Sequence, residues 1–197
     1  MDGPAFYFDL GSPDAYLAAE RVIQTLPVAT EWIGVLARDL PGAESFEAFR
    51  CAEERSIVLG EYEARAARRG LQPLRWPEPF PFETGFAMRA ATYAKSIGKA
   101  VPFALAAFRQ AFAGGRPLDR EDNVLIAASA CEMHPRALLQ GAATKGTAEA
   151  LARATALAAE RGVRDVPAVW TGEEVFHGER DLERAAAALA QRAGAAR

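Results

Sequence analysis

The chain has 197 residues, of which 50% are hydrophobic and 25% are charged, a composition that fits one globular domain or one domain with a large insertion. Its 23 basic and 26 acidic residues give a net charge of −3, which makes it a poor electrostatic partner for nucleic acid. No apolar run approaches the roughly 18 residues that a membrane span needs, and the first residues lack the pattern of a signal peptide. We therefore predict a cytoplasmic protein with no nucleic-acid or membrane partner.

The N-terminal region predicts a strand, a helix and a second strand. Residues 5–10 form a short aromatic run that is typical of a strand. Ser12 suits the N-cap of a helix, and the proline and aspartate that follow it suit the first helical turn. Apolar residues recur at helical spacing over 14–26, and residues 28–34 alternate as in a strand. We therefore expect a parallel β-α-β unit.

The middle of the chain predicts helices that are separated by glycines and one proline-rich loop. We expect helices over 45–69, 85–97, 102–112, 120–130 and 144–161. Residues 71–83 contain four prolines and three aromatic residues, which predicts an extended loop. His134 precedes a proline and is expected to lie at the C-terminus of a helix.

The C-terminal region returns to strand character. Residues 166–170 and 175–177 predict two strands, joined by a hairpin turn at 171–174. A last helix is expected over 181–192. The predicted order is therefore β-α-β, a helical middle, and β-β-α.

Three segments near the two ends of the chain carry family motifs. Residues 6–17 read FYFDLGSPDAYL, residues 162–169 read GVRDVPAV, and residues 176–182 read FHGERDL. They resemble, in this order, the motifs Phe-Tyr-Phe-Asp-x-x-Ser-Pro-Tyr-Ser-Tyr-Leu, Gly-Val-x-Gly-Val-Pro-x-Phe and Phe-Trp-Gly-x-Asp-Arg-Leu. These motifs belong to 2-hydroxychromene-2-carboxylate isomerases and kappa-class glutathione transferases, which are part of the DsbA-like group.

The resemblance implies an α/β, thioredoxin-like fold with a large all-helical insertion, as in DsbA-like and kappa-class proteins. On this basis residues 1–38 and 162–197 form a discontinuous thioredoxin-like domain. Residues 39–161 form the helical insertion domain. The resemblance also implies a homodimer.

Ser12 is the candidate catalytic residue. In a thioredoxin fold the turn at the start of the first helix holds the reactive sulfur, because amide groups and the helix dipole favour a thiolate there. A serine cannot exchange disulfides, but its hydroxyl can donate a hydrogen bond that lowers the pKa of a bound thiol. The resemblance implies that this thiol is glutathione, with another low-molecular-weight thiol such as mycothiol as an alternative. A plain N-cap is the alternative role for Ser12.

The resemblance also implies where the thiol cofactor binds. Val166 and Pro167 are expected to form a cis peptide bond that faces Ser12, with the backbone of Val166 offered to the cofactor. A trans proline on an edge strand is the alternative. The far end of the cofactor is assigned to the loop of Gly178, Glu179, Arg180 and Asp181. Acid and base are exchanged in this loop relative to the family, and a helix cap is its alternative role.

Four residues are candidates for substrate binding: Arg38, Trp76, Glu83 and Thr84. Arg38 corresponds loosely to a basic residue of the family, and the Glu83-Thr84 pair replaces the family's Asn-Thr. A buried, ionised Glu83 beside an anionic cofactor would be unfavourable. Trp76 and the phenylalanines that follow it either wall an apolar substrate pocket or anchor the proline-rich loop to the core.

The resemblance favours an enzyme: a thiol-dependent isomerase or transferase that acts on an aromatic-derived, electron-poor carboxylate. A DsbA-type disulfide oxidoreductase is disfavoured, because position 12 lacks cysteine and because Cys51 and Cys131 are not expected to form a redox pair. A non-catalytic member that binds a thiol or a peptide stays open. No metal site is expected, and neither His134 nor His177 is expected to reach Ser12 as a base.

Overall fold

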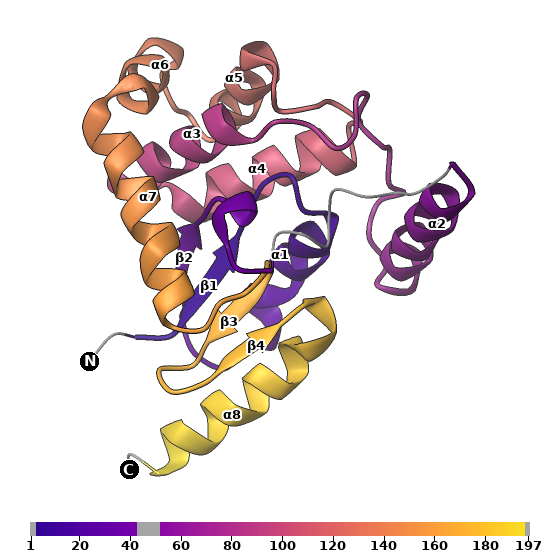
Figure 1. Cartoon of the computed structure of the whole chain (residues 1–197), viewed down its shortest axis with the longest axis vertical. Helices are drawn as coiled ribbons and strands as arrows, with labels where there is room; N and C mark the ends of the chain where they lie inside the picture. Colours follow the sequence, from indigo (N-terminus) through magenta and orange to yellow (C-terminus); the bar gives the residue numbers. More distant parts are fainter. Residues whose placement is uncertain (1–2, 43–51, 196–197) are drawn as a thin grey trace.

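A four-stranded mixed sheet lies at the centre of the computed structural model, which describes residues 3–42 and 52–195 (Figure 1). Its strands are β1 (Ala5–Phe8), β2 (Glu31–Gly34), β3 (Ala168–Trp170) and β4 (Val175–His177). Their order in the sheet is β2-β1-β3-β4. The β1–β2 pair is parallel, and the β1–β3 and β3–β4 pairs are antiparallel. The predicted strands are thus confirmed, although β2 and β3 begin a few residues later than expected.

Helices surround this sheet. Two of them belong to the terminal units: α1 (Pro13–Thr25) and α8 (Leu182–Ala195). The described chain between β2 and β3 contains α2 (Ala52–Arg68), α3 (Gly85–Ser96), α4 (Ala100–Phe112), α5 (Glu121–Ser129), α6 (Pro135–Ala143) and α7 (Lys145–Glu160). Short 3-10 turns follow β2 and β4: η1 (Ala37–Asp39) and η3 (Glu179–Asp181). This is the expected thioredoxin-like arrangement with a helical insertion.

The side chains of β1 alternate between two hydrophobic cores. Phe6 and Phe8 face a core shared with α1, α3, α4 and α8, in which the ring centroids of Phe8 and Phe108 are 5.8 Å apart. Tyr7 faces a second core shared with α7, where Arg161 donates a hydrogen bond to the Tyr7 hydroxyl over 2.6 Å. Because both faces of the strand are buried, its sequence is an uninterrupted apolar and aromatic run.

Helix α7 lies along the second face of the sheet (Figure 1). The Thr155 hydroxyl of α7 accepts a hydrogen bond from the backbone N–H of Leu36, just after β2, over 3.0 Å. The division expected from the family resemblance places residues 144–161 in the insertion, yet α7 completes the layers around the sheet. The division of the chain at 38/39 and 161/162 therefore stays a proposal.

One helix, α6, was not predicted, and the role expected for His134 is wrong. His134 is the N-cap of α6, and its ring nitrogen Nδ1 accepts a hydrogen bond from the backbone N–H of Arg136 over 3.2 Å. Pro135 therefore begins a helix, as proline at the first helical position often does.

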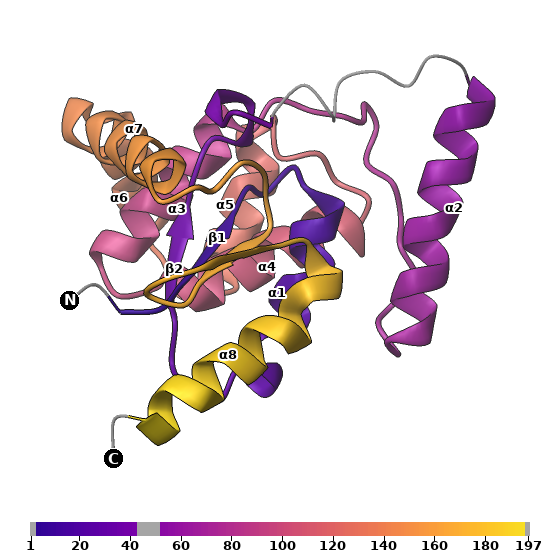
Figure 2. The same ribbon diagram turned by 60° about the horizontal axis from the view of Figure 1, so that its bottom comes forward.

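Helix α2 stands beside the rest of the chain (Figure 2), and Ala66 is its buried residue. The predicted start of this helix at residue 45 lies outside the described residues. The proline-rich loop after α2 is extended, as expected, and Phe80 holds it to the core through ring contacts with Trp76 and Phe112. In the part of the chain that is described, no helix is both long enough and apolar enough to cross a membrane.

Candidate functional site

Ser12 caps α1 and contacts the chain that enters β3. Its hydroxyl oxygen accepts a hydrogen bond from the backbone N–H of Ala15 over 3.1 Å. The same hydroxyl donates to the backbone carbonyl of Val166 over 3.4 Å, which is long for a bond between two oxygens. Ser12 is only 6% exposed. The N-cap role is therefore real, and the hydroxyl proton is held only weakly.

The Val166-Pro167 peptide bond is cis, and Val166 faces Ser12, which confirms the predicted geometry. The backbone groups around this bond are already paired. The Val166 N–H donates to the carboxylate of Asp165 over 2.7 Å, and the Gly178 N–H donates to the Pro167 carbonyl over 2.8 Å. Any ligand that used the Val166 N–H would have to displace the Asp165 carboxylate.

A cavity of about 540 Å³ opens beside the cis bond. One wall is a single face of α2, because its lining residues recur at helical spacing: Glu54, Val58, Leu59, Tyr62 and Arg65. The opposite wall consists of Asp14 at the start of α1, residues 165–167 and residues 177–180, and Phe80 completes the described lining. Ser12 is not among the described lining residues but touches the cavity wall through Val166.

A cluster of ion pairs holds the base of this cavity together. The Glu179 side chain is 1% exposed and forms ion pairs with three arginines. These are Arg21 of α1, Arg65 of α2, and Arg69, which directly follows α2. Asp14 binds Arg65 and also accepts the Glu179 backbone N–H over 2.9 Å. The carboxylates at the loop predicted to bind the cofactor are therefore engaged within the chain.

The other residues of that loop are placed as follows. Gly178 and Arg180 line the cavity, and Asp181 is outside its described lining. Gly178 has a φ of 81°, which favours glycine, and precedes η3 without a side-chain cap bond. Asp181 pairs with Arg184 over 2.9 Å. The expected grouping of these residues with Val166 and Pro167 is present, except for Asp181.

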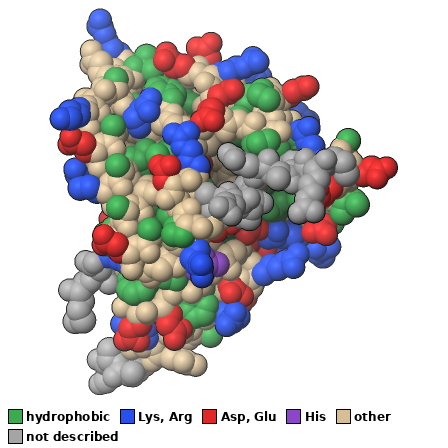
Figure 3. Space-filling model, in the orientation of Figure 1, with side chains coloured by type: hydrophobic (Ala, Val, Ile, Leu, Met, Phe, Trp, Pro, Cys, Tyr) green, Lys and Arg blue, Asp and Glu red, His purple; other side chains and the backbone are tan. Residues whose placement is uncertain are grey.

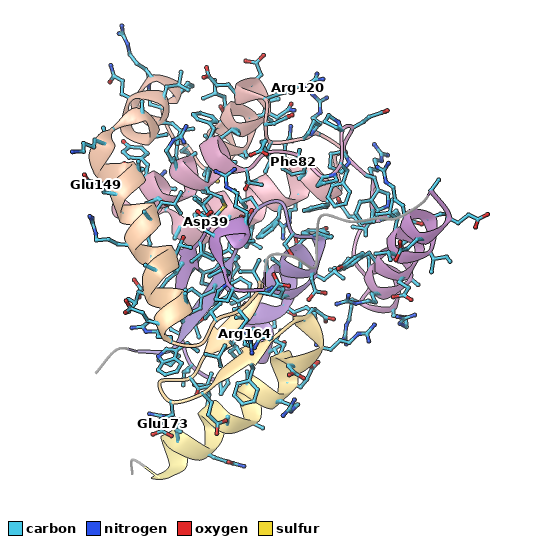
Figure 4. The ribbon with its side chains drawn as sticks, viewed as in Figure 1. Asp39, Phe82, Arg120, Glu149, Arg164 and Glu173 are labelled. Atoms are coloured by element: carbon cyan, nitrogen blue, oxygen red, sulfur yellow. The ribbon has the colours of Figure 1, made fainter. Side chains whose placement is uncertain are left out.

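His177 and Asp165 line the cavity, although neither was predicted as a site residue. Burial lowers the pKa of His177, and its Nε2 accepts the Arg164 backbone N–H over 3.0 Å. Burial raises the pKa of Asp165, while its hydrogen bond from Val166 opposes this shift. The signal was present in the sequence, because the family motifs have tryptophan and glycine at these two positions. Figure 4 shows Arg164, their neighbour, over β3 and β4.

The predicted substrate residues do not line this cavity. Arg38 pairs with Glu83 over 2.8 Å, and the Glu83 side chain is 81% exposed, so the expected burial penalty for this charge does not arise. The Thr84 hydroxyl donates to Asp9 over 3.3 Å, and Trp76 Nε1 donates to Glu63 over 2.7 Å. In Figure 4, Phe82, the sequence neighbour of Glu83, lies over α4, where its ring contacts Phe112.

Asp9 connects three segments behind Ser12. Its carboxylate accepts the backbone N–H groups of Gly11 over 2.9 Å and Ala37 over 3.0 Å, together with the Thr84 hydroxyl. Burial raises the pKa of Asp9, and these hydrogen bonds oppose the shift. Thr84 thus positions the turn that carries Ser12, since it holds Asp9 and lies against Gly11.

The described cysteine, Cys131, does not line this cavity. Cys131 follows α5, is half-buried and is free, and burial raises the pKa of its thiol while Lys99 opposes that shift. Cys51 lies outside the described residues, so the absence of a redox pair stays a prediction. In place of a Cys-x-x-Cys pair, the start of α1 has Ser12 and Ala15. Charges of both signs are interspersed on the face that Figure 3 displays.

Comparisons with solved structures show the same fold. The structure of 2-hydroxychromene-2-carboxylate isomerase matches with a TM-score of 0.84 and 19% identity, over 96% of this chain and 95% of that one. A probable DsbA oxidoreductase from Streptomyces coelicolor matches with a TM-score of 0.80 and 18% identity, over 98% and 91%. The cytosolic disulfide reductase DsbM from Pseudomonas aeruginosa, solved with GSH, has a TM-score of 0.62 and 11% identity, over 96% and 98%.

Sequence comparison gives the family. A search of curated proteins returned no significant match. The family model described as a DSBA-like thioredoxin domain matches residues 5–190, which is nearly the whole chain. The chain therefore belongs to the family of DSBA-like thioredoxin domains.

Proposed function

We propose that this protein is a thiol-dependent isomerase or transferase that acts on an aromatic-derived, electron-poor carboxylate. The observation that carries the proposal is the replacement of the reactive cysteine by Ser12 at the N-cap of α1, beside the cis Val166-Pro167 bond. The overall likeness to 2-hydroxychromene-2-carboxylate isomerase supports the isomerase class. The GSH-bound structure of DsbM supports a low-molecular-weight thiol as cofactor.

Ser12 would stabilise the sulfur of a bound thiol. Its hydroxyl donates a long hydrogen bond of 3.4 Å to the Val166 carbonyl. A thiolate can take the place of this carbonyl as acceptor with little loss of hydrogen-bond energy. The amide end of α1 adds a favourable potential for a negative charge. When bound, the thiol supplies a nucleophilic sulfur that adds reversibly to an electron-poor double bond, which permits rotation before the thiol leaves unchanged.

The cavity offers groups for the other half of the reaction. Val58, Leu59 and Phe80 give it an apolar side that suits an aromatic ring. Arg180 is exposed at the cavity and suits the carboxylate of the substrate. This assignment moves substrate binding away from Arg38, Trp76, Glu83 and Thr84, which lie outside the described lining.

Thiolate absorbance tests the proposal directly. We would titrate a thiol bound to the protein against pH in the ultraviolet and compare wild type with Ser12→Ala. In the wild type the pKa of the bound thiol should fall below its free value of about 8.5, and in Ser12→Ala it should rise again. Ser56→Ala, at an exposed serine of α2, is the matched control and should titrate as wild type. Identical titrations of wild type and Ser12→Ala would contradict the proposal.

A non-catalytic thiol or peptide binder is the second candidate. It is favoured by one observation: Ser12 is only 6% exposed and lies outside the described lining, so a ligand can fill the cavity without contacting the Ser12 hydroxyl. A thiol at a hundredfold excess over Kd would raise the unfolding free energy of such a protein by about 2.7 kcal/mol, which a thermal-shift assay detects as a higher Tm. The pKa of the bound thiol would not change. The same titration therefore separates the two candidates.

A further inference from the structure

We propose that the cavity selects a thiol whose recognition groups are uncharged and discriminates against thiols that bring carboxylates, such as glutathione. This inference rests on the proposed function and specifies its cofactor. It follows from the internal pairing of the groups that would otherwise hold an anionic ligand.

The main-chain donors at the cavity are used within the chain. The N–H groups of Val166 and Glu179 donate to the carboxylates of Asp165 and Asp14, and the N–H of Gly178 donates to a carbonyl. These three amides lie on the loops that form one cavity wall. A carboxylate that arrived with a ligand would have to compete with a carboxylate already held in place.

The less exposed of the two arginines that line the cavity is engaged at its tip. Arg65 binds both Asp14 and Glu179 through Nη2, its side chain is 12% exposed, and its Nε is buried without a hydrogen-bond partner among the described residues. Arg180 is left on the exposed side, where the proposed function uses it for the substrate. His177 lines the same wall, and burial lowers its pKa, so it adds no positive charge near neutral pH.

The carboxylates of the cavity repel a further negative charge. Burial is the largest cause that raises the pKa of Asp165, and the charge of Asp14 raises it as well, so these two groups already oppose each other. Glu54 lines the cavity from α2. A ligand carboxylate beside Asp14 and Asp165 meets like charges at partly buried positions, where screening is weak, whereas the charge of the exposed Glu54 is screened more strongly.

The same groups suit hydroxyl and amide donors. A carboxylate accepts several hydrogen bonds, and those of Asp14 and Asp165 accept one or two each from the chain. Burial raises the pKa of Tyr62 to about 12, so its hydroxyl stays protonated and able to donate. A thiol decorated with hydroxyls or amides therefore fits the cavity better than a thiol decorated with carboxylates.

Calorimetric titration of the full chain with N-acetylcysteine and N-acetylcysteinamide tests this inference, because the two thiols differ by one carboxylate. We expect the amide to bind about tenfold more tightly than the acid. Asp165→Asn keeps an oxygen for the Val166 N–H while removing the charge, and should reduce the ratio to about twofold or less. Asp119→Asn, at an exposed residue outside the described lining, is the charge-matched control and should keep the wild-type ratio.

Glutathione and its diethyl ester form a second pair, and the ester should bind more tightly. Equal or tighter binding of the acids, or an Asp165→Asn ratio that equals the wild-type ratio, would overturn this inference while leaving thiol binding intact. No binding of any of the four thiols would overturn the proposed function and this inference with it.

Discussion

Replacing Glu179 with alanine should destabilise the protein strongly, because this acid is the buried centre of the ion-pair cluster. Its side chain is 1% exposed and contacts Arg21, Arg65 and Arg69. Removing one partner of a buried ion pair costs about 3–5 kcal/mol, since the charge left behind is uncompensated. Arg21 and Arg65 each keep one other carboxylate, so we expect a loss of about 3 kcal/mol, at the lower end of that range.

Urea unfolding followed by circular dichroism measures this loss as a lower midpoint at an unchanged m-value. A chain of this size loses roughly 2–4 °C of Tm for each kcal/mol, so Tm should fall by about 6–12 °C. Glu183→Ala is the control, because Glu183 also pairs with Arg21 but its side chain is 53% exposed, and it should cost less than about 1 kcal/mol. Equal effects of the two substitutions would refute the argument that burial of Glu179 makes its ion pairs important.

Three further outcomes are expected from the described contacts. Gly141→Ala places a methyl group 2.2 Å from the Tyr93 ring and should lower the free energy of unfolding by about 1–3 kcal/mol. Gly60→Ala, at a helical position with open space around it, should raise it by up to about 1 kcal/mol in the same urea titration. The reverse order of stabilities would contradict the packing. The two carboxylate oxygens of Asp9 each accept a backbone N–H, and Asp9→Asn replaces one of these oxygens with an NH2 group that cannot accept. The free energy of unfolding should fall by about 1–3 kcal/mol, seen as a lower Tm. An unchanged Tm would show that these hydrogen bonds do not stabilise the fold. Because burial raises the pKa of Asp165, its protonated form is favoured by folding, and this stabilisation is present below the ordinary value of 3.8 and lost as pH rises through the folded pKa. The unfolding free energy of Asp165→Asn minus that of the wild type should therefore increase as pH rises from about 3 to 6, since the asparagine does not titrate. A decrease of this difference with pH would contradict the effect of burial on the pKa of Asp165.

Local chemistry was sufficient to predict the ends of the fold. The Ser12 cap depends on residues within one helical turn, whereas the cis bond was inferred from the resemblance of a short segment to a family motif. Helix α6 was missed because its signals are ambiguous: Pro135 looks like a helix stop, and Gly141 looks like punctuation. The reason for a glycine in this helix is tertiary, since the Tyr93 ring occupies the place of a side chain.

The site was only partly predictable, because its second wall comes from the placement of α2. No local pattern relates Tyr62 or Arg65 to Pro167, which directly precedes β3. Departures from the family motifs were more informative than the matches: Asp14, Asp165 and His177 replace tyrosine, glycine and tryptophan, and all three line the cavity. The pairing of Arg38 with Glu83 likewise depends on tertiary structure, and no local pattern predicts it.

The pairing of β1 on both sides has a consequence for the order in which the protein is made. One edge of β1 is covered by β2, which follows soon after it in the chain, but the other edge is covered by β3. The chain through Trp170 must therefore leave the ribosome before the sheet can close, and pairing between such distant segments forms slowly. Until then the nascent chain carries an open, aromatic strand edge of the kind that promotes association between chains. Synthesis thus leaves a long interval in which the helices between β2 and β3, or a chaperone, have to keep that edge covered.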